Sequence, residues 1–221
     1  MLKRLSAANL LAMLVFATLS GCTTTNPVID TFTTLLPWRA QYADIKPGFE
    51  YLVVELDSKA SVMALGSRDL LGQGDFAVTN EYWYNGQGEM LHLQNGRILQ
   101  AIGMTREIRR QEGKVPAWRD IDNASRPLSW VRELDVMPGY RFSLKETLIS
   151  YRTTAPATSP KEVAGEVIWI ADEVSSTNEQ NKPWRYKQLF ALQNGKVVYS
   201  EQCIASSLCL KLRPLMVNKQ L

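Results

Sequence analysis

The chain has 221 residues, a formal net charge of +3, 45% hydrophobic residues and a single histidine. The charge is close to balanced and lacks the basic excess of a nucleic-acid-binding domain, so we expect no nucleic-acid partner. His92 is the one histidine, and the three cysteines do not have the spacing of a zinc knuckle, so we expect neither a metal site nor a cofactor.

The N-terminus has the pattern of a secretory signal peptide, which we place at residues 1–21. Lys3 and Arg4 form its positive region, and the apolar stretch Leu10–Leu19 is too short to span a bilayer as a stable helix. The sequence Leu19-Ser20-Gly21-Cys22 at its end resembles the bacterial lipobox. This resemblance implies diacylation of the Cys22 thiol, cleavage before Cys22 and acylation of the new amine. A signal peptide without lipidation, followed by an incidental cysteine, is the alternative.

A cysteine with several acyl chains would anchor the protein permanently in a membrane. The next residue is Thr23 rather than the aspartate that retains enterobacterial lipoproteins at the inner membrane, so the resemblance implies an outer-membrane, periplasm-facing protein. The periplasm is oxidising, which favours a disulfide between the remaining cysteines, Cys203 and Cys209, over two buried thiols.

Residues 22–36 are predicted to comprise the lipidated cysteine and a tether, in which residues 28–36 can form a short amphipathic helix. A single β-rich periplasmic domain is predicted over residues 37–221. Its first strands are Tyr51–Leu56, Ser61–Leu65, Thr79–Tyr84, Glu89–Gln94 and Arg97–Ile102. Asn85-Gly86 and Asn95-Gly96 separate the last three of these, and Asn-Gly pairs between strands predict type I′ turns. The pattern therefore predicts an antiparallel three-stranded meander.

The second half of the domain repeats part of this pattern. Leu93–Ile98 is similar to Leu192–Val197, which suggests two β-layers at about 37–110 and 128–205; the chance recurrence of a common hairpin is the alternative. The predicted strands are Gly139–Arg152, Gly165–Asp172, Trp184–Gln193 and Lys196–Cys203, and the predicted loops are 111–127, 153–160 and 175–183. The fold class is mainly β, with antiparallel sheets forming a sandwich, half-barrel or barrel and few short helices.

Several motifs together resemble one protein family. They are Tyr82-Trp83-Tyr84, Gly88-Glu89-Met90-Leu91, Leu93–Ile98 with Gly103, Tyr42-Ala43, and Trp130–Asp135 running into Pro138–Arg141. Their order resembles the core of the YjbF-type outer-membrane lipoproteins, which belong to operons for group 4 capsule and related exopolysaccharides. The resemblance implies a mainly β lipoprotein that acts in polysaccharide secretion or assembly. Asp44 departs from the family pattern, and the pair Cys203 and Cys209 is not one of its hallmarks.

The residues themselves do not predict catalysis. A Ser-His-Asp triad could use only His92, which alternation places on the sheet face of Met90 and Gln94, opposite Leu91 and Leu93. A glycosidase would need two carboxylates across a cleft. The acidic candidates are Glu81, Glu89, Asp120, Asp122, Glu133 and Asp135. Their separations cannot be read from the sequence, so we assign no catalytic residue.

The candidates for contact with glycan or partner are three aromatic residues, Tyr82, Trp83 and Tyr84, and three basic ones, Arg106, Arg109 and Arg110. Aromatic faces can stack on sugar rings, and guanidinium groups suit acidic polysaccharides. The alternatives are that Trp83 belongs to the core and that the arginines lie on a solvated, salt-bridged surface.

We therefore predict a non-catalytic outer-membrane lipoprotein, an accessory factor in capsule or exopolysaccharide secretion or assembly. Its expected contacts are the polysaccharide or the capsule export proteins. A periplasmic glycan-modifying enzyme and a purely structural envelope lipoprotein are the alternatives.

Overall fold

The structure, a computed structural model, describes residues 45–57, 59–73, 77–157, 163, 166–177, 181–205 and 208–215. The predicted signal peptide, the lipidation site Cys22 and the tether with its helix at 28–36 lie outside the described residues. Among the residues that are described, no helix combines the length and the apolar character needed to cross a bilayer.

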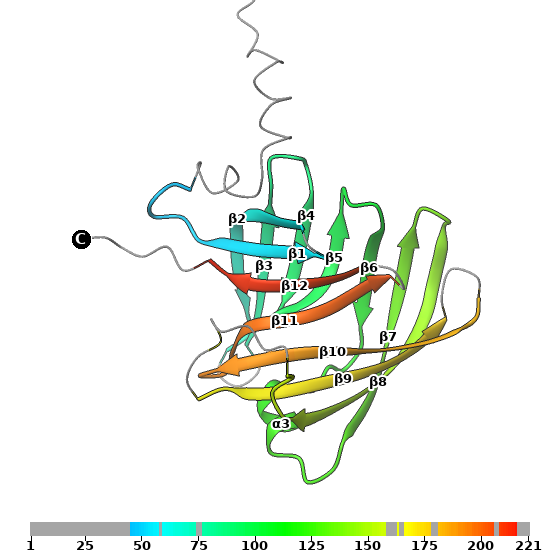
Figure 1. The fold of residues 1–221 in the computed structure, drawn as a ribbon. Helices are drawn as coiled ribbons and strands as arrows, with labels where there is room; N and C mark the ends of the chain where they lie inside the picture. Colours follow the sequence, from blue (N-terminus) through cyan, green and yellow to red (C-terminus); the bar gives the residue numbers. More distant parts are fainter. Residues whose placement is uncertain are drawn as a thin grey trace, which may run out of the picture. The chain divides into compact units, whose positions relative to one another are not determined.

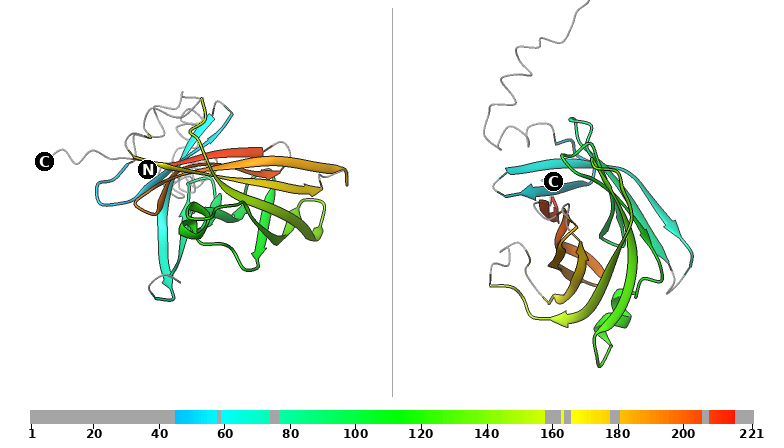
Figure 2. Two further views of the ribbon diagram at one scale, coloured as in Figure 1. Left: turned by 90° about the horizontal axis from the view of Figure 1, so that it is seen from below. Right: turned by 90° about the vertical axis from the view of Figure 1, so that its right-hand side faces the viewer.

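The described residues form a closed antiparallel β-barrel in which each strand pairs with the next and β1 pairs with β12 (Figure 1). The strands are β1 (Tyr51–Leu56), β2 (Lys59–Leu71), β3 (Val78–Tyr84), β4 (Met90–Gln94), β5 (Arg97–Ile102), β6 (Glu107–Glu112), β7 (Leu128–Met137), β8 (Arg141–Thr153), β9 (Ile168–Thr177), β10 (Pro183–Gln193), β11 (Lys196–Ala205) and β12 (Leu208–Pro214). The helix α3 (Trp118–Asp122) lies between β6 and β7. Figure 2 shows the sheet curving round until β1 lies beside β12.

The predicted mainly β fold is confirmed, and the barrel is the form that it takes. Three strands were not predicted, namely β6, β7 and β12, and the predicted loop 111–127 contains α3. The predicted loop 175–183 is too long, because β9 continues to Thr177 and β10 begins at Pro183. The two halves of the domain contribute to one closed sheet, and a duplication remains a prediction.

Two of the three Asn-Gly pairs form the turns that the sequence predicts. Asn95 and Gly96 have φ of 48° and 82°, and Asn194 and Gly195 have φ of 51° and 75°, as a type I′ turn requires. The three predicted strands form the antiparallel meander, but the prediction of a type I′ turn at Asn85-Gly86 is wrong, since neither residue has a positive φ. Asn85 Oδ1 accepts hydrogen bonds from the N–H groups of Gln87 and Glu89, so the side chain organises a longer loop and β4 begins only at Met90.

The core lies inside the barrel because alternate residues of each strand point inward. Its largest apolar cluster includes Leu52, Met63, Trp83, Leu91 and Leu210, all at most 4% exposed. Two ends of the barrel can be distinguished. The Asn-Gly end carries the turns at Asn95-Gly96 and Asn194-Gly195, and the disulfide end carries the β11–β12 turn, where Cys203 and Cys209 pair across the strands and form a disulfide.

The ladder of strands is interrupted at two seams. The register between β5 and β6 contains two pairs, Gln100↔Arg109 and Ala101↔Ile108, and that between β10 and β11 stops at Leu189↔Glu201. Ile98 on β5 and Cys203 on β11 therefore lie beyond the paired stretches of these seams. An extra residue, Leu99, also interrupts the pairing of β5 with β4, since Leu93 pairs with Ile98 and His92 with Gln100.

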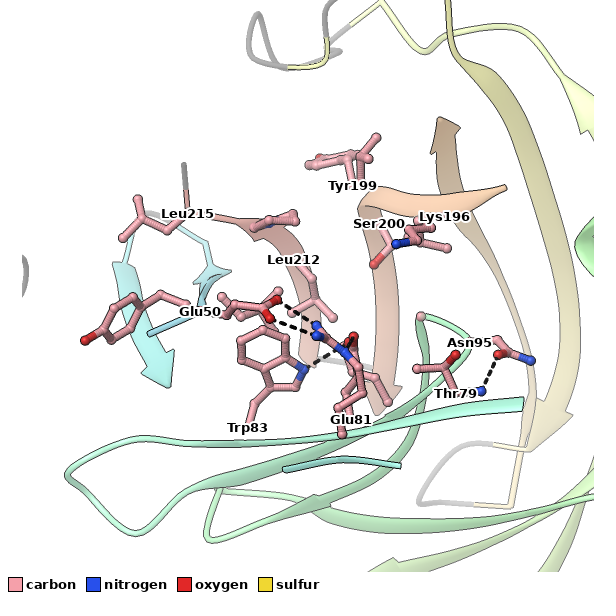
Figure 3. Close-up of a pocket in the computed structure, with 18 of the residues that line it drawn as sticks. Glu50, Thr79, Glu81, Trp83, Asn95, Lys196, Tyr199, Ser200, Leu212 and Leu215 are labelled. Atoms are coloured by element: carbon pink, nitrogen blue, oxygen red, sulfur yellow. Dashed lines mark hydrogen bonds and ion pairs between the residues drawn. The ribbon is translucent and has the colours of Figure 1, made fainter. Parts of the chain in front are cut away.

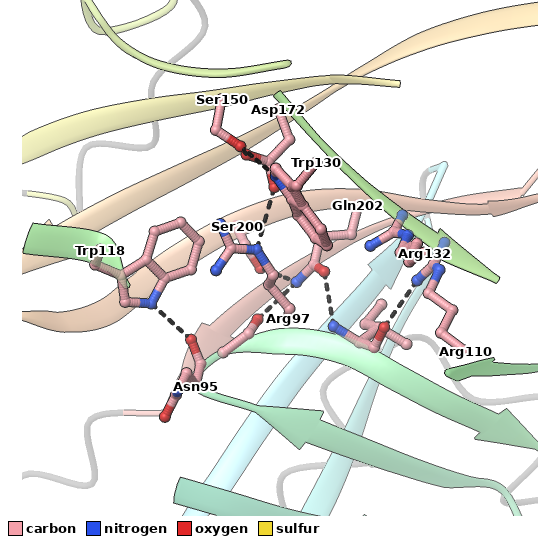
Figure 4. Close-up of polar contacts among 12 residues, drawn as sticks. Asn95, Arg97, Arg110, Trp118, Trp130, Arg132, Ser150, Asp172, Ser200 and Gln202 are labelled. Carbon is pink, nitrogen blue, oxygen red and sulfur yellow. Dashed lines mark hydrogen bonds and ion pairs between the residues drawn. The ribbon is translucent and has the colours of Figure 1, made fainter. Parts of the chain in front are cut away.

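Two side chains join these seams across the barrel, and we call them the cross-barrel bridge. Gln202 accepts a hydrogen bond from Ile98 N–H and donates one to the Gly96 carbonyl, each at 2.8 Å (Figure 4). Arg110 donates to the carbonyls of Ile98 and Cys203, also at 2.8 Å. Both side chains are at most 2% exposed. The bridge thus satisfies buried backbone groups on two opposite strands, β5 and β11.

The bridge brings the two Asn-Gly turns together and divides the Asn-Gly end. On one side α3 packs against the sheet, with Ile121 beside Ile170 and Phe190. Trp118 of α3 donates from its indole nitrogen to the carbonyl of Asn95 at 2.8 Å. The other side is open and forms the cavity described below.

The close contact of the two turns makes Gly96 and Gly195 unequal. A Cβ built on Gly96 would lie 2.6 Å from Val197 Cβ, whereas one on Gly195 would meet no atom within 4 Å. Gly195→Ala should destabilise the protein by about 1–2 kcal/mol through positive φ alone. Gly96→Ala should lower the free energy of unfolding by a further ~1–3 kcal/mol, because its Cβ would overpack against Val197. Urea unfolding measures both losses, and equal losses for the two variants would refute the contact.

Candidate functional site

A cavity of about 830 Å³ lies at the Asn-Gly end of the barrel. Residues of β1, β2, β3, β4, β11 and β12, together with both Asn-Gly turns, line it. Its walls include the buried side chains Leu52, Trp83, Leu93 and Leu212. Exposed or half-buried residues at its edge are Phe49, Glu50, Arg68 and Lys196. The cavity therefore combines apolar walls with a charged rim.

The charged rim is organised around Arg68 of β2. Its two terminal nitrogens donate to the two carboxylate oxygens of Glu50 at 2.8 and 2.7 Å, and its Nε donates to Glu81 Oε1 at 2.9 Å. The second oxygen of Glu81 accepts a hydrogen bond from the Trp83 indole nitrogen at 3.3 Å. Figure 3 shows Glu50, Glu81 and Trp83 grouped together, with Lys196 projecting from β11.

The electrostatics of this group favour ionised side chains. The hydrogen bonds from Arg68 lower the pKa of Glu50 against the opposing effect of burial, and the positive charges of Arg68 and Lys196 add to the lowering. The hydrogen bond to Glu50 likewise raises the pKa of Arg68. Glu50 is thus a carboxylate at neutral pH and has the opposite pKa shift from a glycosidase general acid.

The predicted aromatic contact residues divide between the two faces of the sheet. Trp83 faces inward, is 4% exposed and lines the cavity. Tyr82 and Tyr84 face outward: Tyr84 is 48% exposed, and Tyr82 stacks on His92 with ring centroids 4.3 Å apart. The three residues therefore do not form one surface.

His92 lies on the outer face of the sheet, as alternation predicts. Its Nε2 is 2.9 Å from Asn80 Oδ1, and burial lowers its pKa against the opposing charge of Asp69. The ring contacts account for its position without a catalytic role.

The three predicted arginines are likewise separated. Arg109 is exposed on β6, and Arg106 donates to the carbonyl of Pro138 at 3.2 Å. The prediction that Arg110 is available for contact at the surface is wrong. Arg110 lies inside the barrel as part of the cross-barrel bridge. Inward alternation on β6 explains this position, since Ile108 and Arg110 share the inner face.

A second charged group lies sealed inside the barrel, next to the bridge. The carboxylate of Glu146 is 2.6 Å from Arg132 Nε and 3.5 Å from Arg110 Nε, and it accepts a hydrogen bond from the Tyr186 hydroxyl at 2.7 Å. Burial opposes ionisation of Glu146, but Arg132, Arg110 and Tyr186 outweigh it and lower its pKa. Burial together with the charge of Glu146 raises the pKa of Tyr186 to about 12.

A chain of buried polar groups continues from the same interior. The Trp130 indole donates to Ser150, Ser150 donates to Asp172, and Arg97 Nε donates to the second oxygen of Asp172. The Arg97 guanidinium lies 3.5 Å from the centroid of the Trp118 ring (Figure 4). Asp172, Ser150 and Arg97 are at most 2% exposed, so the contacts stabilise the interior and are closed to a substrate.

The acidic residues considered for glycosidase chemistry are not gathered around the cavity. Glu81 lines it, but Glu89 binds Asn85 in the β3–β4 loop, Asp122 pairs with Arg152, and Asp135 accepts from the Ser143 amide. Within the described part of the chain, no three His, Cys, Asp or Glu side chains are arranged to hold a metal ion.

Sequence reasoning missed the main rim residues Glu50, Arg68 and Lys196. They come from β1's leading segment, β2 and β11 and are brought together only by closure of the barrel. A sequence signal was available for Arg68 and Glu81 alone, as a charge pair across the antiparallel strands β2 and β3.

Glu146→Gln tests the buried charges. The substitution removes the buried carboxylate that lies against both Arg110 and Arg132 and should lower the free energy of unfolding at neutral pH by about 3–5 kcal/mol. Because the folded-state pKa is lowered, Glu146 contributes fully above its unfolded pKa of about 4.5, and the contribution is lost as the pH falls toward the folded-state value. The gap between wild type and variant should therefore narrow in acid.

Urea unfolding between about pH 7 and pH 3 measures this gap. The exposed Glu173, which accepts a hydrogen bond from Tyr151, provides the control. Glu173→Gln should change stability by about 0.5 kcal/mol or less. A loss in Glu146→Gln no larger than in the control would show that the buried network is not held by its charges.

Comparison with known proteins identifies one matching family. The family model described as group 4 capsule polysaccharide lipoprotein gfcB, YjbF matches residues 39–212. Among solved structures, the hypothetical lipoprotein YmcC from Escherichia coli K12 has a TM-score of 0.60 and 17% sequence identity, over 87% of this chain and 98% of that chain. At this identity the likeness establishes the fold. No curated protein matches the chain significantly.

Proposed function

The chain belongs to the YjbF family of group 4 capsule polysaccharide lipoproteins, and from this premise we propose that it is a non-catalytic accessory factor that holds a segment of capsule polysaccharide at its open cavity. The proposal includes a lipid anchor at Cys22 in the outer membrane and a barrel that faces the periplasm. The sequence analysis predicts the same process, capsule or exopolysaccharide secretion or assembly. The proposal adds that the cavity is the site of contact with the polysaccharide.

The cavity is the observation that supports glycan binding. Its volume of about 830 Å³ lies within the range of ~300–1,000 Å³ common to small-molecule sites. The aromatic walls and the charged rim supply the two kinds of contact that a sugar chain uses, namely stacking and directed hydrogen bonds. An opening at one end also suits a polymer, because a single segment can enter while the rest remains outside.

The chemistry of the lining favours binding over hydrolysis. The carboxylates that line the cavity are Glu50 and Glu81, and the same guanidinium binds both. A glycosidase needs one protonated carboxyl group as general acid, held by a raised pKa. The pKa of Glu50 is lowered instead. Both groups therefore act as hydrogen-bond acceptors for Arg68.

Thr79→Trp tests the proposal by filling the cavity. Thr79 lines the cavity, and the interaction that it makes there uses its backbone N–H, which donates to Asn95 Oδ1. The mature lipoprotein in detergent micelles is titrated with the capsule polysaccharide of the producing strain by calorimetry. Wild type should bind, and Thr79→Trp should lose at least about tenfold in affinity, or ~1.4 kcal/mol.

The matched control is Thr147→Trp, the same substitution at an exposed position of β8 outside the cavity. It should bind as wild type does, and circular dichroism checks that both variants retain the β fold. No binding by wild type would contradict the proposed function and favour a lipoprotein that only braces an envelope complex. Equal binding by both variants would place the glycan elsewhere.

A further inference from the structure

We propose that Arg68 is the receptor for the carboxylate of an acidic sugar residue, a uronate, and that Glu50 occupies this receptor as a replaceable substitute in the free protein. The inference rests on the proposed function and adds the chemical class of the ligand. It follows from three features of the rim: how Arg68 is held, how Glu50 is held, and what charge remains when Glu50 moves away.

Arg68 is fixed independently of Glu50. Its Nε donates to Glu81 at 2.9 Å, and Glu81 in turn accepts from the Trp83 indole, which is buried in the wall. Arg68 and Glu81 are also directly paired across β2 and β3. The two terminal nitrogens are thereby aimed by rigid strands, and they form the planar fork that binds a carboxylate through two parallel hydrogen bonds.

Glu50 fills this fork but is weakly held by the rest of the protein. It precedes β1, and its side chain is 59% exposed. An exposed ion pair contributes only about 0–1 kcal/mol, because water solvates both charges well when they separate. A ligand carboxylate can therefore take the place of the Glu50 carboxylate with the same geometry and little loss, and further sugar contacts then add to the affinity.

Departure of Glu50 changes the charge of the rim. While Glu50 is in place, Arg68 and Lys196 balance Glu50 and Glu81. Lys196 acts on the same carboxylate, since its positive charge contributes to the lowered pKa of Glu50. With Glu50 turned outward, two cations face one fixed anion, and the opening attracts an anionic residue more than a neutral one. The exposed ring of Phe49 lies beside this opening and offers a face for the sugar.

The test uses the mature lipoprotein in micelles, with a galacturonate tetramer as the acidic probe and maltotetraose as the neutral one. Glu50→Gln removes the competing charge and should raise the affinity for the acidic probe about fivefold or more. Arg68→Gln should lower the affinity for the acidic probe more than tenfold. Arg68→Lys keeps the positive charge but lacks the two-pronged guanidinium group, so its affinity should lie between those of Arg68→Gln and wild type. The affinity for maltotetraose should change in none of them.

The ion pair of Arg152 with Asp122 provides the controls, because it also joins a guanidinium to a carboxylate and lies outside the cavity. Arg152→Gln and Asp122→Asn should bind the acidic probe as wild type does. If wild type binds its capsule polysaccharide while Glu50→Gln and Arg68→Gln leave every affinity unchanged, the inference fails and the proposed function stands. Equal affinity of wild type for the two probes would also overturn it. Failure to bind the capsule polysaccharide at all counts against the proposed function itself.

Discussion

The barrel depends on the hydrogen bonds that Gln202 and Arg110 make across its interior. The sheet is incompletely paired at the β5–β6 and β10–β11 seams, and Ile98 and Cys203 lie beyond the paired stretches of these two seams. A buried backbone group without a partner destabilises a protein by about 1–3 kcal/mol. Gln202 and Arg110 bind backbone groups of these two residues and convert two weak seams into one contact between opposite walls.

The bridge in turn requires the buried charges around it. A buried guanidinium is stabilised by a nearby anion, and Glu146 places a buried carboxylate against both Arg110 and Arg132. At the Asn-Gly end, the contact between β5 and β11 holds Gly96 against Val197. The helix α3 covers one side of this contact between β5 and β11. The other side is left uncovered, and the cavity lies there. The rim group of Glu50, Arg68 and Glu81 lies on that open side.

The sequence predicts the fold where local chemistry decides it. β1, β3 and β5 have the predicted bounds to within one residue, and two Asn-Gly pairs form type I′ turns, because alternation and positive φ are local properties. β6 was missed because Glu107–Glu112 reads as a charged surface segment, yet Arg110 points inward. Inside the barrel Arg110 contacts Glu146 and the carbonyls of Ile98 and Cys203. These partners lie on other strands, so no local sequence pattern reveals them. The family resemblance was confirmed, whereas the cavity rim depends on closure of β1 on β12.

The most direct measurement of the bridge is amide hydrogen exchange at Ile98 in the native protein. If the Gln202 side chain holds this N–H inside the barrel, it should exchange as slowly as the central amides of β4 and β9 and only through global unfolding. Exchange of Ile98 as fast as that of the amides in the loop at Asn85–Gly88 would contradict the bridge.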